Sequence, residues 1–131
     1  MGINDITSQI IGAAIEVHRL LGPGFLESVY EEALSIEMSM RDILFTGQVV
    51  VGVNYKSNIV GKGKLDFLVG GKLIVELKAV EMLAPIHSAQ LLSYLKMTGF
   101  HLGLLINFNI TVLKNGLKRI ILSQPLANLA S

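Results

Sequence analysis

Three charged side chains lie within two short apolar segments near the middle of the chain. The run from Lys64 to Lys78 reads K-L-D-F-L-V-G-G-K-L-I-V-E-L-K, which predicts two strands joined at a Gly-Gly pair. Asp66 belongs to the first strand, and Glu76 and Lys78 belong to the second. Strands of this composition usually bury one face, so their charged side chains need a partner, water or a ligand. Because side chains alternate along a strand, Glu76 and Lys78 point to the same side.

Two arrangements fit this pattern. Two carboxylates can bind a divalent cation, and the Lys78 ammonium beside them can stabilise a developing negative charge. The plainer alternative is a salt-bridged hairpin. The turn distinguishes them, because a two-residue turn at Gly70–Gly71 would pair Asp66 with Val75 and point Glu76 away from Asp66. A cation site therefore needs a three-residue loop or a bulge near Asp66, and we predict one of these.

The composition favours one apolar domain. The chain has 131 residues, of which 51% are hydrophobic and 16% are charged. We expect a single domain over residues 1–131, with about 124–131 as a loose tail. The low charge density leaves apolar surface for a homodimer contact. The net charge of +1 argues against nucleic-acid binding through overall charge, but it allows a local basic groove.

The sequence also restricts the compartment. There is no cysteine, which excludes disulfides and thiolate metal sites. No stretch approaches the ~20 apolar residues of a membrane span, and the N-terminal residues lack the features of a signal peptide. We therefore expect a cytoplasmic protein without a membrane partner.

Apolar periodicity predicts the secondary structure. Residues at helical spacing indicate helices over about 5–21, 25–40 and 86–99, the second with an apolar stripe of Leu26, Val29, Ala33, Ile36 and Met40. Apolar runs indicate strands over about 48–56, from 59 into the central hairpin, over 101–108 and over 117–122. Hairpins pair antiparallel strands, whereas a helical crossover brings in a parallel neighbour. The order α-α-β-β-β-α-β-β thus predicts an α/β fold with a central mixed sheet flanked by helices.

Four polar residues on the predicted helices could serve such a site. Glu27 lies in the first turn of the second helix, where a carboxylate also stabilises the helix dipole. Gln90 and Tyr94 are four residues apart on the third helix, so their side chains project together. The plainer alternative is that this polar pair only marks the edge of an apolar stripe. His87 is in line with them, but it can equally form a contact at the helix start, so we leave it out of the catalytic set.

Three motifs resemble those of a known family. The segment from Gly24 to Tyr30 reads G-F-L-E-S-V-Y and resembles the G-x-x-E-x-x-Y signature of the GxxExxY proteins. Asp66 followed by Glu76–Lys78 resembles the D…E-x-K core of the PD-(D/E)XK nuclease superfamily, to which that family is similar. Gln90–Tyr94 resembles the Q-x-x-x-Y motif of several branches of that superfamily. The resemblance covers nearly the whole chain and implies a restriction-endonuclease-like core.

This resemblance implies a metal site. The Asp66 and Glu76 carboxylates and the backbone carbonyl of Leu77 would bind Mg²⁺ or Mn²⁺, which prefer oxygen ligands. Glu27 would supply a further ligand or hold a water molecule.

The resemblance also implies the reaction. Lys78 would orient the attacking water or stabilise charge on the phosphate, and Gln90 and Tyr94 would bind the substrate backbone or brace the metal ligands. The chain would be a small metal-dependent nuclease that hydrolyses phosphodiester bonds, with DNA favoured over RNA. The alternative is a catalytically silent nuclease-fold module for nucleic-acid or protein binding or dimerisation. Six further cations could contact a phosphate backbone or simply solubilise the surface: Lys62, Lys64, Lys72, Lys114, Lys118 and Arg119.

Overall fold

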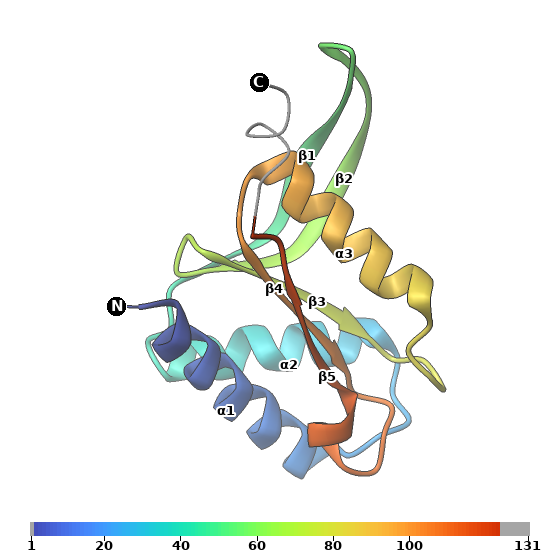
Figure 1. Ribbon diagram of the computed structural model, residues 1–131. Coiled ribbons are helices and arrows are strands. Elements are labelled where there is room, and N and C mark those ends of the chain that lie inside the picture. The colour runs from blue at the N-terminus through green and yellow to red at the C-terminus, as the bar shows by residue number, and fades with distance from the viewer. Residues whose placement is uncertain (1, 124–131) are drawn as a thin grey trace.

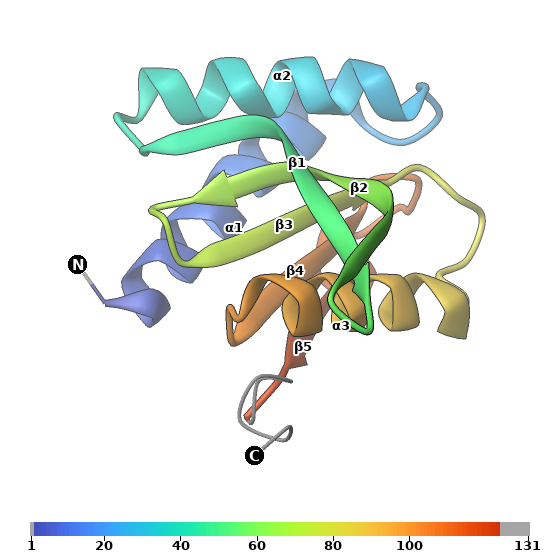
Figure 2. The same cartoon turned by 90° about the horizontal axis from the view of Figure 1, so that it is seen from above.

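A computed structural model describes residues 2–123 of the chain. Five strands form one mixed sheet in the order β1-β2-β3-β4-β5, flanked by helices as predicted. Helices α1 and α2 cover one face of the sheet, and α3 covers the other (Figure 1, Figure 2). The helices and strands span Ile3–Leu21 (α1), Glu27–Met40 (α2), Phe45–Tyr55 (β1), Asn58–Val69 (β2), Leu73–Lys78 (β3), Pro85–Thr98 (α3), Leu102–Asn107 (β4), Leu113–Gly116 (the 3-10 helix η1) and Leu117–Ile121 (β5). None of these helices is long and apolar enough to cross a membrane.

Strands β3 and β4 form the parallel centre of the sheet. They pair from Leu73 with Leu102 to Lys78 with Asn107, and α3 is the crossover between them. The other neighbouring pairs are antiparallel. Because α3 returns the chain to the start of β4, its first turn follows the carboxyl end of β3 and its last turn precedes the amino end of β4.

The alternation of side chains along β3 decides what each face of the sheet contains. Val75 and Leu77 pack into the larger apolar cluster beneath α1 and α2. Ile74 packs into the smaller cluster beneath α3, together with Leu91. Glu76 occupies the next position on the α3 face after Ile74, so the charge enters the sheet beneath a helix rather than at its rim.

The buried face of α2 differs from the predicted one. Tyr30, Leu34 and Met38 are fully buried, whereas Ile36 and Met40 are exposed by 53% and 75%. The predicted stripe is therefore wrong by a rotation of the helix. Apolar residues surround much of α2, and the face that is buried is the one on which the Tyr30 hydroxyl finds hydrogen-bond partners.

The hairpin between β2 and β3 closes with the three-residue loop that a cation site requires. Val69 pairs with Leu73 and Phe67 pairs with Val75, so Gly70, Gly71 and Lys72 form the loop. Both glycines have positive φ, at 60° and 67°, which L side chains rarely adopt. This register turns Asp66 and Glu76 to the same face of the sheet, as predicted.

The strands β1 and β2 continue far beyond β3. Only Phe67–Val69 of β2 pair with β3, and the preceding residues pair with β1 alone. We call residues 49–65 the β1–β2 arm, which extends past α3 as a two-stranded ribbon (Figure 1, Figure 2). Gln48, where the arm begins, has a φ of 53° and interrupts the regular ladder opposite Asp66. The tail expected at 124–131 lies outside the described residues.

Candidate active site

The carboxylates of the central hairpin meet at the carboxyl end of β3. The backbone N–H of Leu77 donates a hydrogen bond to Asp66 Oδ2 over 2.8 Å, which holds the Asp66 side chain across the strand pair. The Asp66 carboxylate lies close enough to Glu76 to raise its pKa, and the charge of Lys78 acts on both Glu76 and Glu27. The resulting cluster has carboxylates from two strands and one ammonium group on the same face.

Glu76 is the most unusual residue of this cluster. Its exposed fraction is only 7%, and its Oε1 atom has no hydrogen-bond partner among the described residues. Burial, and then the neighbouring Asp66 carboxylate, raise the pKa of Glu76 to about 9. A buried carboxyl oxygen without a partner destabilises the protein by about 1–3 kcal/mol, so its position requires a reason other than packing.

Glu27 reaches the cluster because of how α2 begins. The fully buried Tyr30 donates its hydroxyl hydrogen to the Gly22 carbonyl over 2.6 Å and accepts a hydrogen bond from the Phe25 N–H over 3.1 Å. The Tyr30 ring stacks on Phe108 with centroids 4.7 Å apart, which anchors the first turn of α2. Partial burial raises the pKa of Glu27, and the negative charge of Asp66 raises it further.

Helix α3 contributes the opposite wall. His87, Gln90 and Tyr94 lie at successive turns of the same face, as the spacing predicted. The Tyr94 ring rests on β2 at Gly63, where a Cβ atom would collide with the ring. The side chain of Gln90 is exposed and that of Tyr94 is partly buried, so both remain accessible from the open side of the pocket.

These side chains enclose a pocket of about 170 Å³. All six predicted catalytic residues line it, and none is elsewhere. The complete lining is Glu27, Lys64, Asp66, Glu76, Lys78, His87, Gln90, Leu91 and Tyr94. The structure therefore brings the predicted set together from α2, β2, β3 and α3, while the role of each residue stays a prediction.

The donor set suits a hard divalent cation, although it is not a complete ligand cage. The orphaned Glu76 Oε1 and the adjacent Asp66 carboxylate are oxygen ligands of the kind that Mg²⁺ prefers. No group of three or more His, Asp or Glu side chains within residues 2–123 is arranged to hold a metal ion. Mg²⁺ commonly binds through one or two carboxylates and retains several waters, so two carboxylates fit it. Leu77, predicted to act through its carbonyl, contacts Asp66 through its N–H.

The structure adds residues that the motifs do not include. His87 lines the pocket, and its Nδ1 accepts a hydrogen bond from the Ala84 N–H over 3.0 Å. That bond leaves the ring proton of neutral His87 on Nε2, as a donor. Lys64 also lines the pocket. Burial raises the pKa of the neighbouring Glu31, a hydrogen bond with Gln48 lowers it, and the Asp66 charge raises it further. Helical spacing from Gln90 and Glu27 was the signal for His87 and Glu31.

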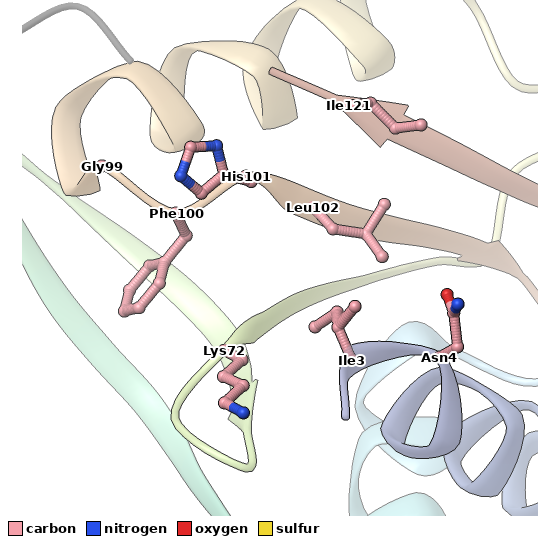
Figure 3. Close-up of a pocket in the computed structure, with 8 residues that line it drawn as sticks. All are labelled: Ile3, Asn4, Lys72, Gly99, Phe100, His101, Leu102 and Ile121. Carbon is pink, nitrogen blue, oxygen red and sulfur yellow. The ribbon is translucent and has the colours of Figure 1, made fainter. Parts of the chain in front are cut away.

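A larger cavity lies at the other end of β3 and lacks this chemistry. Its volume is about 440 Å³, and its walls come from α1, the β2–β3 loop, the end of α3 and the two strands that follow it (Figure 3). Ile3, Phe100 and Leu102 are among its apolar side chains, and none of the described residues that line it carries a carboxylate. The candidate active site is therefore the smaller pocket, because the polar groups converge there.

Comparison with known proteins agrees with this geometry. The sequence profile of the PD-(D/E)XK nuclease superfamily matches residues 4–120 of the chain. The chain therefore belongs to the PD-(D/E)XK nuclease superfamily, and its sheet and flanking helices are consistent with the restriction-endonuclease-like fold. Enzymes of this superfamily usually use Mg²⁺ or Mn²⁺. Searches among curated proteins and solved structures gave no match.

Proposed function

We propose that this protein is a metal-dependent nuclease of the GxxExxY kind, which hydrolyses phosphodiester bonds in nucleic acid, with DNA favoured over RNA. One observation carries the proposal: the buried Glu76 has an unpartnered Oε1 beside the Asp66 carboxylate, with Lys78 two residues further along the strand. A cation between the two carboxylates would supply the missing partner. An ordinary salt-bridged hairpin explains neither the orphaned oxygen nor the raised pKa of Glu76.

The proposed ligands of Mg²⁺ or Mn²⁺ are Asp66 and Glu76, with the Leu77 carbonyl and Glu27 as additional oxygen donors. When bound, such an ion polarises a phosphoryl oxygen and lowers the pKa of a bound water. The N–H of Leu77 donates a hydrogen bond to Asp66 Oδ2, so we assign the role of metal ligand to Asp66 Oδ1. Glu27 comes from a different element, so its distance from the pair depends on the anchoring of α2 by Tyr30.

The remaining side chains would act on the substrate directly. Lys78 is partly buried, so its ammonium would oppose negative charge on a phosphoryl group more strongly than a solvated lysine would. The Gln90 amide and the Tyr94 hydroxyl would donate hydrogen bonds to the nucleic-acid backbone. The His87 Nε2–H is a further donor for a phosphate oxygen. The Glu27 carboxylate would hold a water on the α2 side of the pocket.

The direct test is a cleavage assay with plasmid, duplex and single-stranded DNA and RNA, each with Mg²⁺, Mn²⁺ or EDTA. We expect metal-dependent cleavage that Asp66→Ala abolishes and that Asp5→Ala, an exposed carboxylate on α1, leaves intact. Cleavage that survives Asp66→Ala would come from a contaminating enzyme. If the wild-type protein cleaves no substrate form with either ion, the nuclease proposal is wrong.

A second function is also supported, because no group of three or more His, Asp or Glu side chains within residues 2–123 is arranged to hold a metal ion. The chain would then be a silent nuclease-fold module that binds nucleic acid or protein. In that case the wild-type protein would bind without cleaving, and added Mg²⁺ or Mn²⁺ would not change its stability. The single domain over 1–131 and the homodimer also stay predictions, which sedimentation and limited proteolysis would test.

A further inference from the structure

We infer that the β1–β2 arm is a duplex-DNA contact that leads into the active site. This inference rests on the proposed function, because it names the substrate class of the proposed nuclease. The arm joins the site at its base: Lys64 lines the pocket, and Gly63 lies under the Tyr94 ring. A ligand lying along the arm would therefore pass directly to Asp66 and Glu76.

The arm has the charge for a polyanion. Residues 49–65 contain three lysines and no acidic residue, so the arm carries a net charge of +3 while the rest of the chain sums to −2. Lys62 and Lys64 are exposed and point to the same side of β2, about 7 Å apart along the strand. Lys56 is at the tip. The excess positive charge of the chain is thus concentrated on the β1–β2 arm, which extends from the site.

The arm is also too apolar to be only a solvated hairpin. Val50, Ile59 and Val60 are exposed by 58%, 70% and 63%. Val50 pairs with Lys64 and lies on the same face of the arm. The opposite face is covered near its base, where Val51 packs against the smaller apolar cluster beneath α3. Exposed apolar side chains interleaved with lysines on a free ribbon indicate a surface that a partner covers.

The shape of the arm favours duplex DNA. The major groove of B-DNA, about 12 Å wide, admits a two-stranded β-ribbon, whereas the major groove of A-form RNA is too narrow to be read by side chains. A platform for single strands needs several free aromatic faces. The arm has one aromatic residue, Tyr55, and the Lys56 ammonium lies over its ring, 5.4 Å from the centroid. The arm therefore lacks the free aromatic rings on which unpaired bases would stack.

Binding is tested without cleavage, by fluorescence anisotropy of the full chain with a labelled 30-base-pair duplex in EDTA over a salt series. The arm variant is Lys56→Gln/Lys62→Gln, which leaves the pocket residue Lys64 intact. The matched control is Lys114→Gln/Lys118→Gln, which removes the same charge from exposed positions on η1 and β5. We expect the arm variant to lose at least about fivefold in affinity and nearly two units of log–log salt slope. The control variant should lose less affinity and less salt slope than the arm variant.

Each alternative has its own result. Equal losses in the two variants would mean that net charge alone matters, and no loss in the arm variant would exclude the arm; both overturn the inference. Tighter arm-dependent binding to single-stranded DNA or RNA would overturn its assignment to duplex DNA. A change of oligomeric state in the arm variant, with duplex binding unchanged, would identify the arm as a protein contact instead. Arm-dependent duplex binding by a protein that cleaves nothing would refute the nuclease proposal and leave this inference standing.

Discussion

The two ends of strand β3 carry pockets of opposite character. At the amino end, an open cavity of about 440 Å³ is lined mostly by apolar side chains such as Ile3, Phe100 and Leu102 (Figure 3). At the carboxyl end, a pocket of about 170 Å³ contains three carboxylates and two lysines. Apolar lining, a usual guide to a ligand pocket, therefore points to the opposite end of the strand from the end where the polar groups converge.

The difference arises from two positions on the same face of β3. Ile74 packs under α3 in an ordinary apolar cluster, whereas Glu76, the next residue on that face, is buried with an unpartnered oxygen. An apolar residue at position 76 would make the sheet more stable. A buried carboxyl group that lowers stability is a candidate for binding or catalysis, so the energetic cost of a group is a better guide to a site than the volume around it.

The largest expected effect is on the chemistry at the carboxyl end. Lys78→Gln keeps the length and polarity of the side chain but removes the charge beside the carboxylates. We expect the cleavage rate to fall by about 10²–10³-fold, the loss typical of one electrostatic donor. The control, Ile121→Trp, places a large ring at the larger cavity and should leave the rate within about twofold. If Ile121→Trp is the more damaging variant, the active site lies at the other end of β3.

The next effect is on stability, and its sign depends on pH. The pKa of Glu76 is raised from an ordinary 4.5 to about 9, so between these values the folded protein keeps a proton that the unfolded chain releases. The free energy of unfolding therefore falls as pH rises through this range in EDTA. Glu76→Gln removes the titrating group. At pH 8 in EDTA, about 3.5 pH units above the pKa of the unfolded chain, it should stabilise the protein by several kcal/mol, up to about 5 kcal/mol. Near pH 5 the difference should shrink.

Thermal unfolding of both proteins at several pH values, with and without Mg²⁺ or Mn²⁺, measures this effect. The wild-type protein should gain stability from the ions at pH 8, because an ion that binds only the folded state raises the midpoint temperature. Glu76→Gln should gain less. A wild-type protein that is most stable at pH 8 in EDTA would contradict the buried, unpartnered carboxyl group.

The order of elements and the alignment of Asp66 with Glu76 could be predicted because each rests on local information, while the roles of the six predicted site residues stay predictions. The Asp66–Glu76 alignment followed from counting residues around the turn: the site needed a third loop residue, and Lys72 supplies it. Helical periodicity placed Gln90 and Tyr94 on one face of α3, whereas Glu27 was expected at the pocket only from the family resemblance.

The features that sequence could not predict depend on tertiary contacts. The buried side of α2 is chosen by the hydrogen bonds of Tyr30 with Gly22 and Phe25, residues outside the helix. The length of the arm depends on where β3 stops pairing with β2, which no local pattern encodes. His87 was ambiguous for a physical reason, because it both contacts the helix start and lines the pocket.

The hydroxyl group of Tyr30 should contribute to the stability of the folded protein. Tyr30→Phe retains the stacking on Phe108 but leaves the Gly22 carbonyl and the Phe25 N–H without their partner. We expect a loss of about 1–2 kcal/mol in the free energy of unfolding, measured by urea denaturation. The control is Tyr55→Phe on the exposed arm, where no change is expected. Equal effects of the two substitutions would contradict a role for Tyr30 in anchoring α2.

The smallest effect separates the two contacts of His87. An Asn side chain at position 87 can present Oδ1 to the Ala84 N–H, as Nδ1 of the histidine does, but it lacks the Nε2–H donor. We therefore expect His87→Asn to unfold at nearly the wild-type temperature while cleaving about tenfold more slowly, the loss of roughly one hydrogen bond to the substrate. His87→Ala should show the same rate defect together with a destabilisation of about 1 kcal/mol, because the first turn of α3 loses its cap. If His87→Asn cleaves at the wild-type rate, His87 is only a helix cap, and the hydrogen-bond donors that line the pocket reduce to Lys64, Lys78, Gln90 and Tyr94.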